Sequence, residues 1–381
     1  MMRLSNIKVC HIIIGLGVGG AELMLKRLIE CNRDDTYYSH SVISLTSIGV
    51  VGAQLKAINV EVVELSIDSV LDLPIAFWRL TRMLRSKRPD IVQTWMYHAD
   101  LFGGMAARFA GIRNVIWGIR GTLIPQGLWS RTRFIIWLCA NVSHWMPRRI
   151  VCCAEAALSS HVGMGYAVEK MVVIPNGYDL SVFTTTPALK QRVRDQVGFS
   201  SDSVVISTVG RFDPLKDYEN FVKAAKLVGI HRPLVRFMMI GRGVDAANTV
   251  LVDWLADTGF ADRFVLLGER NDIVDLMAAT DIYCLASRAE GFPNVVAEAM
   301  AMQVPCVVTN AGDAASIVKD TGIVVPPQSS VALADALIAM VDLTFAQRAL
   351  FGIRARKIIE KSYSIEVILF QYKSLYSSVI S

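Results

Sequence analysis

Glu290 and Glu298 stand eight positions apart in the segment AEGFPNVVAE, where their carboxylates could accept hydrogen bonds from hydroxyl groups. Pro293 suits the first turn of a helix, so the backbone N–H groups of Phe292, Asn294 and Val295 are predicted to lie at its N-terminus. Such an end favours a diphosphate. Glu298, one turn inside, could accept two vicinal hydroxyls of a ribose, and Glu290 would project from the loop before the helix. Taken as a spacing alone, two glutamates eight apart are more often ordinary surface residues.

Two basic side chains upstream could neutralise the same diphosphate. Arg211 follows a predicted strand at residues 204–209, and Lys216 comes five residues later, at the start of a predicted helix. Arginine contributes a planar fork of donors and lysine a point charge, and both can stabilise a leaving diphosphate. For either residue alone, a solubilising surface position is the alternative interpretation. Gly241, in IGRGVD, directly follows a second predicted strand. This turn could also be an ordinary tight connection between a strand and a helix.

A glycine-rich segment near the N-terminus, GLGVGGAE, has the spacing Gly-x-Gly-x-x-Gly that is typical of dinucleotide-binding loops. A nicotinamide or flavin site also needs an acidic side chain about 20 residues further on, at the end of the second strand. The predicted second strand, 39–45, is followed by TSIG, and the next acidic residue is Glu61. The segment therefore predicts a glycine loop at a helix N-terminus that serves another anion.

Short β-rich runs alternate with helical stretches along the chain, which predicts an α/β protein with parallel sheets. The turn-rich segment 176–191 separates the runs into two series. We therefore expect two doubly wound Rossmann-like domains, 1–180 and 181–362, facing each other across a cleft, and a helix at 363–381 that crosses back to the first domain. The predicted strands are residues 8–14, 39–45, 60–65, 91–95, 115–119, 150–154, 172–175, 204–209, 236–240, 264–267, 282–286, 306–309 and 323–325.

Composition limits the class of protein further. Hydrophobic residues make up 53% of the 381 residues and charged residues 19%, so large buried cores are expected and disorder is not. The seven cysteines show no C-x-x-C spacing and mostly stand in apolar runs, which predicts reduced core residues without disulfides or structural zinc. We find neither a signal-peptide pattern nor an apolar run long enough to span a membrane, so we expect a cytoplasmic protein.

The positive charge is concentrated in the first half of the chain. Residues 1–180 hold 19 basic and 13 acidic residues, whereas residues 181–381 hold 20 and 21. The excess lies mainly in the segments 79–89 and 130–149, where arginines flank Trp, Phe, Ile and Leu. Such an amphipathic surface can rest on anionic lipid headgroups, and ordinary domain helices with solvated charges explain it equally well. Nucleic acid is not an expected partner, because no nucleic-acid-binding module is recognisable.

Five segments together resemble the successive motifs of the retaining glycosyltransferases of family 4, which have the two-domain GT-B fold: VIPNGYD, VGRFDPLKD, FMMIGRG, FVLLGERNDI and DIYCLASRAEGFPNVVAEAMAMQVPCVVT. The resemblance extends over nearly the whole chain, and its most specific part is the Glu290–Glu298 pair. GGAE, at residues 19–22, is similar to the family's N-terminal glycine loop. The glycines would then let the first domain approach a sugar nucleotide or the acceptor closely, without a nicotinamide.

The resemblance implies a role for each candidate residue. Arg211 and Lys216 would grip the donor pyrophosphate and Glu298 the nucleotide ribose, while Glu290 would contact the transferred sugar. His98, in QTWMYHAD, matches the family's first-domain histidine near the donor sugar, although a lone histidine is also often structural. The implied catalytic residues are Glu290 and His98, and the implied donor-binding set is Gly19, Gly20, Arg211, Lys216, Gly241, Glu290, Phe292, Asn294, Val295 and Glu298.

Arg120, in WGIRGT, follows another predicted strand. It could meet an acidic acceptor, or it could form an ion pair at the edge of the core. The sequence leaves both interpretations open.

The activity implied by the resemblance is transfer of a sugar from a nucleotide-sugar donor, a UDP-sugar, to a glycan or lipid-linked acceptor in bacterial surface polysaccharide biosynthesis, with retention of anomeric configuration. No cofactor or metal is expected, because fixed cations can stabilise the leaving diphosphate and the chain has no Asp-x-Asp triplet. No side chain stands out as a nucleophile, which favours front-face attack assisted by the departing phosphate. Two other classes stay open: a GT-B sugar-nucleotide epimerase or phosphorylase, and a non-catalytic nucleotide-sugar-binding protein.

Overall fold

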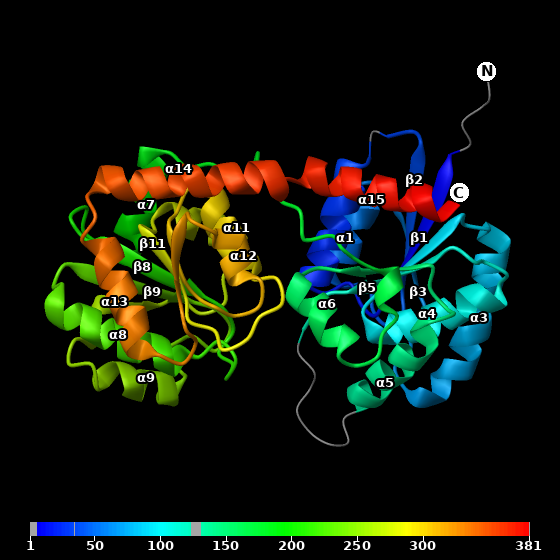
Figure 1. Cartoon of the computed structure of the whole chain (residues 1–381), viewed down its shortest axis with the longest axis horizontal. Coiled ribbons are helices and arrows are strands. Elements are labelled where there is room, and N and C mark those ends of the chain that lie inside the picture. Colours follow the sequence, from blue (N-terminus) through cyan, green and yellow to red (C-terminus); the bar gives the residue numbers. More distant parts are fainter. Residues whose placement is uncertain (1–5, 34, 123–130, 381) are drawn as a thin grey trace. The chain divides into compact units, whose positions relative to one another are not determined.

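The computed structural model describes residues 6–33, 35–122 and 131–380, and the chain divides into two compact units. The first unit comprises Met1–Gly177 with Ile365–Ser381, and the second comprises Tyr178–Ser364. Each unit is built on a parallel sheet with helices packed on it (Figure 1). The fold class expected from the alternation of strands and helices is therefore confirmed.

The first unit contains a seven-stranded sheet in the order β3-β2-β1-β4-β5-β6-β7. Every residue of β4 and β5 is buried, as expected for central parallel strands that helices cover on both faces. The strands are β1 (Ile7–Ile13), β2 (Tyr38–Ser44), β3 (Glu61–Glu64), β4 (Ile91–Trp95), β5 (Val115–Ile119), β6 (Arg149–Cys152) and β7 (Met171–Val173).

Helices cover both faces of this sheet. Along β1, Val9 and Ile13 belong to the core cluster that contains α1, α2 and α15, whereas Ile12 lies next to Gly103 of α4. Helices α3, α4 and α5 pack side by side on that second face. The helices of the unit are α1 (Gly20–Cys31), α2 (Gly49–Ala57), α3 (Leu73–Lys87), α4 (Tyr97–Phe109), α5 (Arg131–Ser143), α6 (Glu155–Val162) and α15 (Ile365–Ile380), with short 3-10 turns at Val70–Asp72 and Val168–Lys170.

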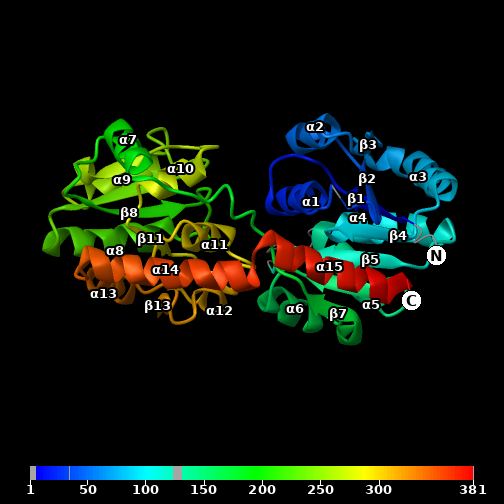
Figure 2. The same ribbon diagram turned by 90° about the horizontal axis from the view of Figure 1, so that it is seen from above.

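Helix α15, the last element of the chain, belongs to the first unit. It packs beside α1, and Ile368, Tyr372 and Tyr376 are buried in the same cluster as Met24 and Leu28 (Figure 2). The preceding helix, α14 (Phe345–Ser362), belongs to the second unit. The C-terminal segment therefore crosses back to the first unit.

A chain of polar side chains runs through the core of the first unit. Trp95 Nε1 donates to His11 Nδ1 at 3.2 Å, so the proton of His11 is on Nε2, which lies 2.9 Å from His40 Nδ1. His40 then carries its proton on Nε2, 2.7 Å from the Asn32 amide, whose oxygen rather than nitrogen must face it. Burial lowers the pKa of His40 to about 4 and that of His11 well below its usual value, so both rings are neutral.

The second unit contains a six-stranded sheet in the order β10-β9-β8-β11-β12-β13. Side chains alternate along β8 and β9, so Ile206 and Phe237 face one core cluster while Val205 and Met238 face another. The strands are β8 (Val204–Val209), β9 (Val235–Ile240), β10 (Phe264–Leu266), β11 (Ile282–Leu285), β12 (Cys306–Thr309) and β13 (Gly322–Val325).

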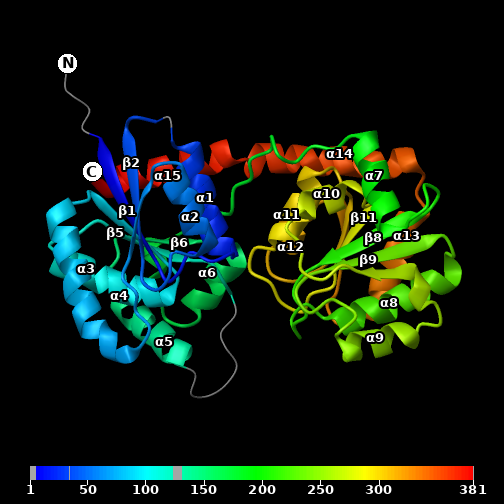
Figure 3. The same ribbon diagram turned by 180° about the vertical axis from the view of Figure 1, so that it is seen from behind.

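Two layers of helices enclose this sheet. Helices α8, α9 and α13 supply one core cluster, and α7 and α10 supply the other (Figure 3). Among the described residues no single helix is long and apolar enough to cross a membrane, and only the bent pair Ser330–Asp342 and Phe345–Ser362 meets that criterion jointly. The helices are α7 (Pro187–Val197), α8 (Tyr218–His231), α9 (Thr249–Ala256), α10 (Ile273–Ala278), α11 (Asn294–Ala301), α12 (Ala314–Val318), α13 (Ser330–Val341) and α14, with a 3-10 turn at Ala261–Arg263.

Local sequence signals set the limits of several of these elements, and α7 illustrates them. Thr186 accepts a hydrogen bond from Leu189 N and caps the helix, and Pro187 occupies its first position. Gly198 ends the helix with φ +75°, a conformation that costs glycine little. Each of the thirteen strands predicted from the sequence overlaps an observed strand, with ends that differ by at most two residues.

Candidate functional site

The loop after β11 places Glu290 against two donors. Its Oε1 atom accepts hydrogen bonds from Lys216 Nζ and from Ser287 Oγ, each at 2.6 Å. The Glu290 side chain is 11% exposed and that of Lys216 24%, so the ion pair is largely shielded from water but still reachable. The loops after β8 and β11, which carry opposite charges, therefore meet at the carboxyl edge of the second sheet.

Close packing against the loop after β12 holds the Glu290 loop in place. Gly312 has φ +56°, and a Cβ there would lie 2.4 Å from the Glu290 carbonyl oxygen, so only glycine fits. Thr309 Oγ1 donates to the Ser287 carbonyl at 2.6 Å. The segment that carries Glu290 is thus fixed from both its backbone and its side chain.

Arg211 and Lys216 lie in the same loop, between β8 and α8, but have different surroundings. Arg211 is 54% exposed, and its Nε lies 3.0 Å from Asp213 Oδ2. The Leu215 N–H and the Arg211 guanidinium lower the pKa of Asp213. The Lys216 side chain instead runs beside Gly210 toward Glu290. Both cations of the loop thus contact a carboxylate, but Arg211 is mostly exposed and Lys216 is mostly shielded from solvent.

A second ion pair, which the sequence analysis did not identify, joins the same two loops. Arg288 Nη2 donates to Asp217 Oδ1 at 2.7 Å, and the Arg288 N–H donates to the Leu215 carbonyl at 2.8 Å. Asp217 is 3% exposed and has φ +52°, which non-glycine residues rarely adopt. Because Asp217 follows Lys216, and Arg288 comes two residues before Glu290, this pair fixes the relative position of the two loops.

Gly241 brings the ends of β8 and β9 into backbone contact. It has φ +147°, and a Cβ there would lie 1.8 Å from the Gly210 carbonyl oxygen and 3.1 Å from Arg211 N. Gly241 N also donates to the Gly268 carbonyl at 2.8 Å. The tight connection therefore requires glycine, and it leaves the edge beside Arg211 without a side chain.

Helix α11 begins one residue later than the sequence indicated. Pro293 is its N-cap residue rather than part of its first turn, and it has no side-chain group that could cap the helix. The hydroxyl of Tyr178 donates to Asn294 Oδ1 at 2.8 Å. The Phe292 ring stacks on Tyr178 and is 7% exposed, so Phe292 can contribute only its backbone to a ligand. Val295 and Glu298 are half-buried on the helix.

In the first unit, His98 follows β4 as the second residue of α4. The turn before it is strained, since Met96 has φ +73°. The buried Asp100 carboxylate fixes this turn by accepting hydrogen bonds from Thr94 Oγ1 and, at 3.3 Å, from Gly118 N. Burial raises the pKa of Asp100 to about 7 and lowers the pKa of His98. His98 is therefore half-buried and follows a turn that the Asp100 side chain holds in place.

Arg120, after β5, is held by neutral groups rather than by a carboxylate. Its Nη1 donates to Asn176 Oδ1 at 3.1 Å, and its Nη2 donates to the hydroxyl of Tyr372 in α15. The guanidinium carbon lies 4.9 Å from the centroid of the Trp95 ring. Within the described part of the chain it forms no ion pair, so that interpretation was wrong. Contact with an acidic acceptor stays a prediction.

The glycine loop after β1 ends at the start of α1. Gly19 is the N-cap residue and Gly20 the first residue of the helix, and a Cβ at Gly19 would lie 2.4 Å from Glu22 Oε2. Burial raises the pKa of Glu22. Because Glu22 already brings a carboxylate to this helix N-terminus, the loop suits a hydroxyl group better than a phosphate.

The second sheet thus brings most of the predicted residues of its edge together: Lys216 touches Glu290, and Gly241 packs beside Arg211. In the first unit, no hydrogen bond among the described residues joins Gly19, His98 and Arg120 to one another. No three His, Cys, Asp or Glu side chains gather as a metal site within residues 6–33, 35–122 and 131–380. Cations, a carboxylate and a helix N-terminus at one edge can bind a diphosphate and a hydroxyl-rich group together.

The fold and the carboxyl edge of the second sheet define a class of protein. It has two parallel α/β units, and that edge can bind an anion and hydroxyl groups. The family model described as Glycosyltransferase Family 4 matches residues 18–182, and the one described as Glycosyl transferases group 1 matches residues 203–342. The chain therefore belongs to the family 4, group 1 glycosyltransferases.

Two relatives show the range of the family. The chain is 29% identical over 247 residues to the UDP-Gal:alpha-D-GlcNAc-diphosphoundecaprenol alpha-1,3-galactosyltransferase of Escherichia coli, and this match spans 63% of either chain, less than two thirds of the relative's length. It is 26% identical over 330 residues to a GDP-mannose-dependent monoacylated alpha-(1-6)-phosphatidylinositol monomannoside mannosyltransferase of Corynebacterium glutamicum, which covers 82% of both. The two names specify different nucleotide donors.

Solved structures share the fold. The crystal structure of Anabaena HepE in complex with UDP has a TM-score of 0.86 at 22% identity and covers 98% of this chain and 100% of that chain. The UDP-glucose complex of the same protein has a TM-score of 0.84. At this level of identity the likeness establishes the GT-B fold.

Proposed function

We propose that this protein moves a sugar from a UDP-sugar donor to a glycan or lipid-linked saccharide acceptor in bacterial surface polysaccharide biosynthesis. The observation that carries the proposal is the contact between Lys216 and Glu290 at the carboxyl edge of the second sheet, where ligands of open α/β sheets bind. The names of the relatives supply the reaction class, and the UDP complexes of HepE support a uridine donor.

The charges at that edge suggest how the donor is cleaved. Breaking the bond between the anomeric carbon and the diphosphate leaves negative charge on the departing oxygen. Arg211 and Lys216 would stabilise this charge together with the N-terminus of α11. Because these groups are held in place by the fold, the reaction would need no metal ion or other cofactor.

Glu290 would contact the transferred sugar, and Glu298 the ribose. Lys216, bonded to Glu290 in the structure, would lie between that sugar contact and the diphosphate and so couple the two. Attack of the acceptor on the face that the phosphate leaves would retain the anomeric configuration. His98, whose lowered pKa keeps it neutral at pH 7, could accept a hydrogen bond from a sugar hydroxyl.

The direct test is a panel of nucleotide sugars with lipid-linked acceptors, read by mass spectrometry of the acceptor. We expect one UDP-sugar to extend an acceptor by one residue. Glu290→Gln should slow transfer by about 10²-fold or more. Its affinity for UDP, measured by calorimetry, should stay within a few-fold of wild type. Glu219→Gln, which removes an exposed carboxylate paired with Lys223, is the matched control and should behave like wild type.

The same experiment separates the competing classes. Sugar or sugar phosphate released without an acceptor would identify an epimerase or a phosphorylase. If the protein binds UDP-sugars without turnover, and its function in cells survives Glu290→Gln, it is a non-catalytic binding protein. Transfer supported only by GDP-sugars would refute the uridine donor while leaving the reaction class intact.

We further propose that the protein works at the cytoplasmic face of the membrane, as a peripheral protein. The support is the basic and aromatic character of the segments 79–89 and 130–149. Fractionation of cells settles this: recovery of all activity in the soluble fraction at low salt would contradict it.

A further inference from the structure

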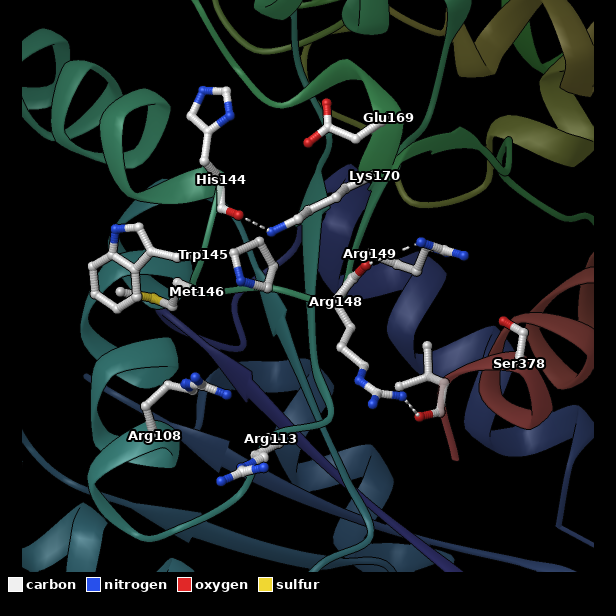
Figure 4. Close-up of a pocket in the computed structure, with 12 residues that line it drawn as sticks. Arg108, Arg113, His144, Trp145, Met146, Arg148, Arg149, Glu169, Lys170 and Ser378 are labelled. Atoms are coloured by element: carbon white, nitrogen blue, oxygen red, sulfur yellow. Dashed lines mark hydrogen bonds between the residues drawn. The ribbon is translucent and has the colours of Figure 1, made fainter. Parts of the chain in front are cut away.

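The first unit has a surface hollow of about 520 Å³ at the amino edge of its sheet, the edge opposite to His98 and Arg120. Arg113 precedes β5, Arg148 directly precedes β6, and Lys170 directly precedes β7. In Figure 4, Arg108 and Arg113 enter from the α4 side, and Arg148 and Arg149 from the β6 side. Basic side chains from four separate segments therefore line one concave surface.

Among the described residues, four arginines and one acidic residue line this hollow. No ion pair joins Arg108, Arg113, Arg148 or Arg149 to a carboxylate within the residues that the structure describes. Between Asp100 and Glu155 the sequence holds seven arginines and no acidic residue, and the acid that lines the hollow is Glu169.

Two of the basic groups are already oriented by backbone carbonyls. Lys170 Nζ donates to Ser143 O at 3.0 Å and also to His144 O, and Arg148 Nη1 donates to Val379 O at 2.7 Å. Burial lowers the pKa of Lys170. Of the two neighbouring charges, Glu169 raises this pKa and Arg108 lowers it by a smaller amount.

Exposed aromatic side chains continue from the hollow along α5. Trp145 lines the hollow and is 59% exposed. On α5, Phe134 and Trp137 are 60% and 58% exposed, with their rings stacked 5.8 Å apart. Because burying an aromatic ring is favourable, rings left exposed beside arginines indicate a surface that becomes covered by a partner.

We propose that the outer face of α5 and this hollow together form a docking surface for an anionic lipid bilayer. The three aromatic side chains would enter the boundary between headgroups and acyl chains, and the unpaired arginines would bind lipid phosphates. The inference specifies the surface used by the membrane association proposed above and does not depend on which sugar is transferred.

The arrangement fits a bilayer better than a nucleic acid. Exposed tryptophan and phenylalanine on a helix flanked by arginines match the amphipathic pattern of interfacial helices. Helix α5 runs from the carboxyl edge of the sheet, after β5, back to its amino edge, before β6. A bilayer lying along α5 would therefore contact the flank of the unit and leave the loop that carries His98 open to substrate.

The test is flotation of the full-length protein with vesicles of equal parts phosphatidylcholine and phosphatidylglycerol, compared with phosphatidylcholine alone. Two double variants probe the surface: Trp137→Ser with Trp145→Ser, and Arg108→Gln with Arg113→Gln. Each should weaken partitioning into the anionic vesicles about tenfold or more, and only the arginine variant should lose the preference for anionic lipid. Phe345→Ser with Arg270→Gln, an exposed aromatic and an exposed arginine of the second unit, is the matched control and should stay within about twofold of wild type.

UDP calorimetry on the same variants separates this inference from the proposed activity. Double variants that lose flotation but bind UDP like wild type support the docking surface. If the wild-type protein does not bind UDP but floats, and the double variants lose flotation, the docking surface is supported and the UDP donor is refuted. Equal binding to both kinds of vesicle, or wild-type flotation by both double variants, would overturn the inference. So would tight binding of RNA, lost in the arginine variant, without any binding to vesicles.

Discussion

The two units handle positive charge in different ways. In the first unit, the arginines of the basic hollow have no carboxylate partner within the described ranges, and they stand beside exposed aromatic rings. In the second unit, most of the described arginines are paired with acids, among them Arg194 with Asp281, Arg232 with Asp342, Arg270 with Asp272, Arg288 with Asp217, and Arg354 with Asp320.

The difference corresponds to two kinds of partner. A cation paired with a carboxylate is held in one geometry, which suits a small ligand bound in a defined pose. Arginines without a carboxylate partner, such as Arg108 and Arg113, can adjust their orientation on an open surface, which suits a partner with charge but no fixed shape. The contrast predicts that removing a paired charge that is shielded from water in the second unit damages activity or stability, whereas removing an unpaired one in the first unit does not.

The largest effect is expected at Lys216. Lys216→Met removes the cation that contacts Glu290 and would stabilise the leaving diphosphate, so kcat/KM with the active nucleotide sugar should fall by about 10²–10³-fold. Lys223→Met, which removes an exposed lysine paired with Glu219, is the control and should change kcat/KM less than about twofold. Equal losses in both variants would mean that the charge acts through the general field rather than through the site.

The buried Asp100 carboxyl group should make the unfolding free energy depend on pH. Its folded-state pKa of about 7 lies above the usual value of 3.8, so the folded protein binds more protons than the unfolded chain between pH 4 and pH 7, and stability falls as the pH rises through that window. Asp100→Asn cannot ionise and can still accept from Thr94 and Gly118. Its advantage in unfolding free energy should grow from near zero at pH 4 to as much as about 4 kcal/mol at pH 8.

Urea unfolding of both proteins across this pH range measures the difference. The buried pair His11 and His40 titrates with the opposite sign, because its lowered pKa values make stability rise with pH. That contribution is common to wild type and variant and cancels. An advantage that is the same at pH 4 and pH 8 would show that Asp100 is not the group responsible.

A direct comparison of one arginine from each unit can break the contrast. Arg288→Gln leaves the buried carboxylate of Asp217 without its partner and should lower the unfolding free energy by about 2 kcal/mol. Arg113→Gln removes an unpaired arginine and should change it by less than about 0.5 kcal/mol. Denaturant midpoints under the same conditions decide, and similar losses in the two variants would contradict the distinction drawn here.

The smallest effect concerns two buried tyrosine hydroxyls. Tyr372→Phe removes the acceptor of Arg120 Nη2. Because Arg120 Nε already lacks a hydrogen-bond partner among the described residues, the variant should lose about 1–2 kcal/mol of unfolding free energy. The hydroxyl of Tyr283 in the second unit is buried without a partner in the described structure, so Tyr283→Phe should be neutral or slightly stabilising. Thermal unfolding of the two variants gives the comparison, and a loss at Tyr283 would reveal a partner such as a bound water.

Much of the fold was predictable because periodicity is a local property. Strands of parallel sheets read as short apolar runs between helical stretches, and those runs identified β1 to β13 in both units. The start of α11 was misplaced by one residue, because proline is compatible with both the N-cap and the first turn and the local sequence does not distinguish them.

The site was predictable only where a motif marked it. Nothing in the spacing of Asp217 and Arg288 indicates that they meet, since 71 residues separate them and the contact depends on how two loops pack. The ion pair suggested for Arg120 was wrong for the same reason: its actual partner, Tyr372, comes from the last helix of the chain, 252 residues away. Whether Arg113 and Arg148 are paired likewise depends on neighbours that only the tertiary structure supplies.

The return of α15 to the first unit has a consequence for how the protein is made. The second unit is one continuous segment, 178–364, so all its strands are available once residue 364 has left the ribosome. The first unit, although its sheet is synthesised earlier, lacks Ile368, Tyr372 and Tyr376 until α15 has been synthesised. Domains usually mature in the order of their synthesis, and the return of α15 delays completion of the first core beyond that of the second unit. The apolar surface around Met24 and Leu28 is therefore uncovered until α15 packs on it, which makes it a natural point of contact for a chaperone.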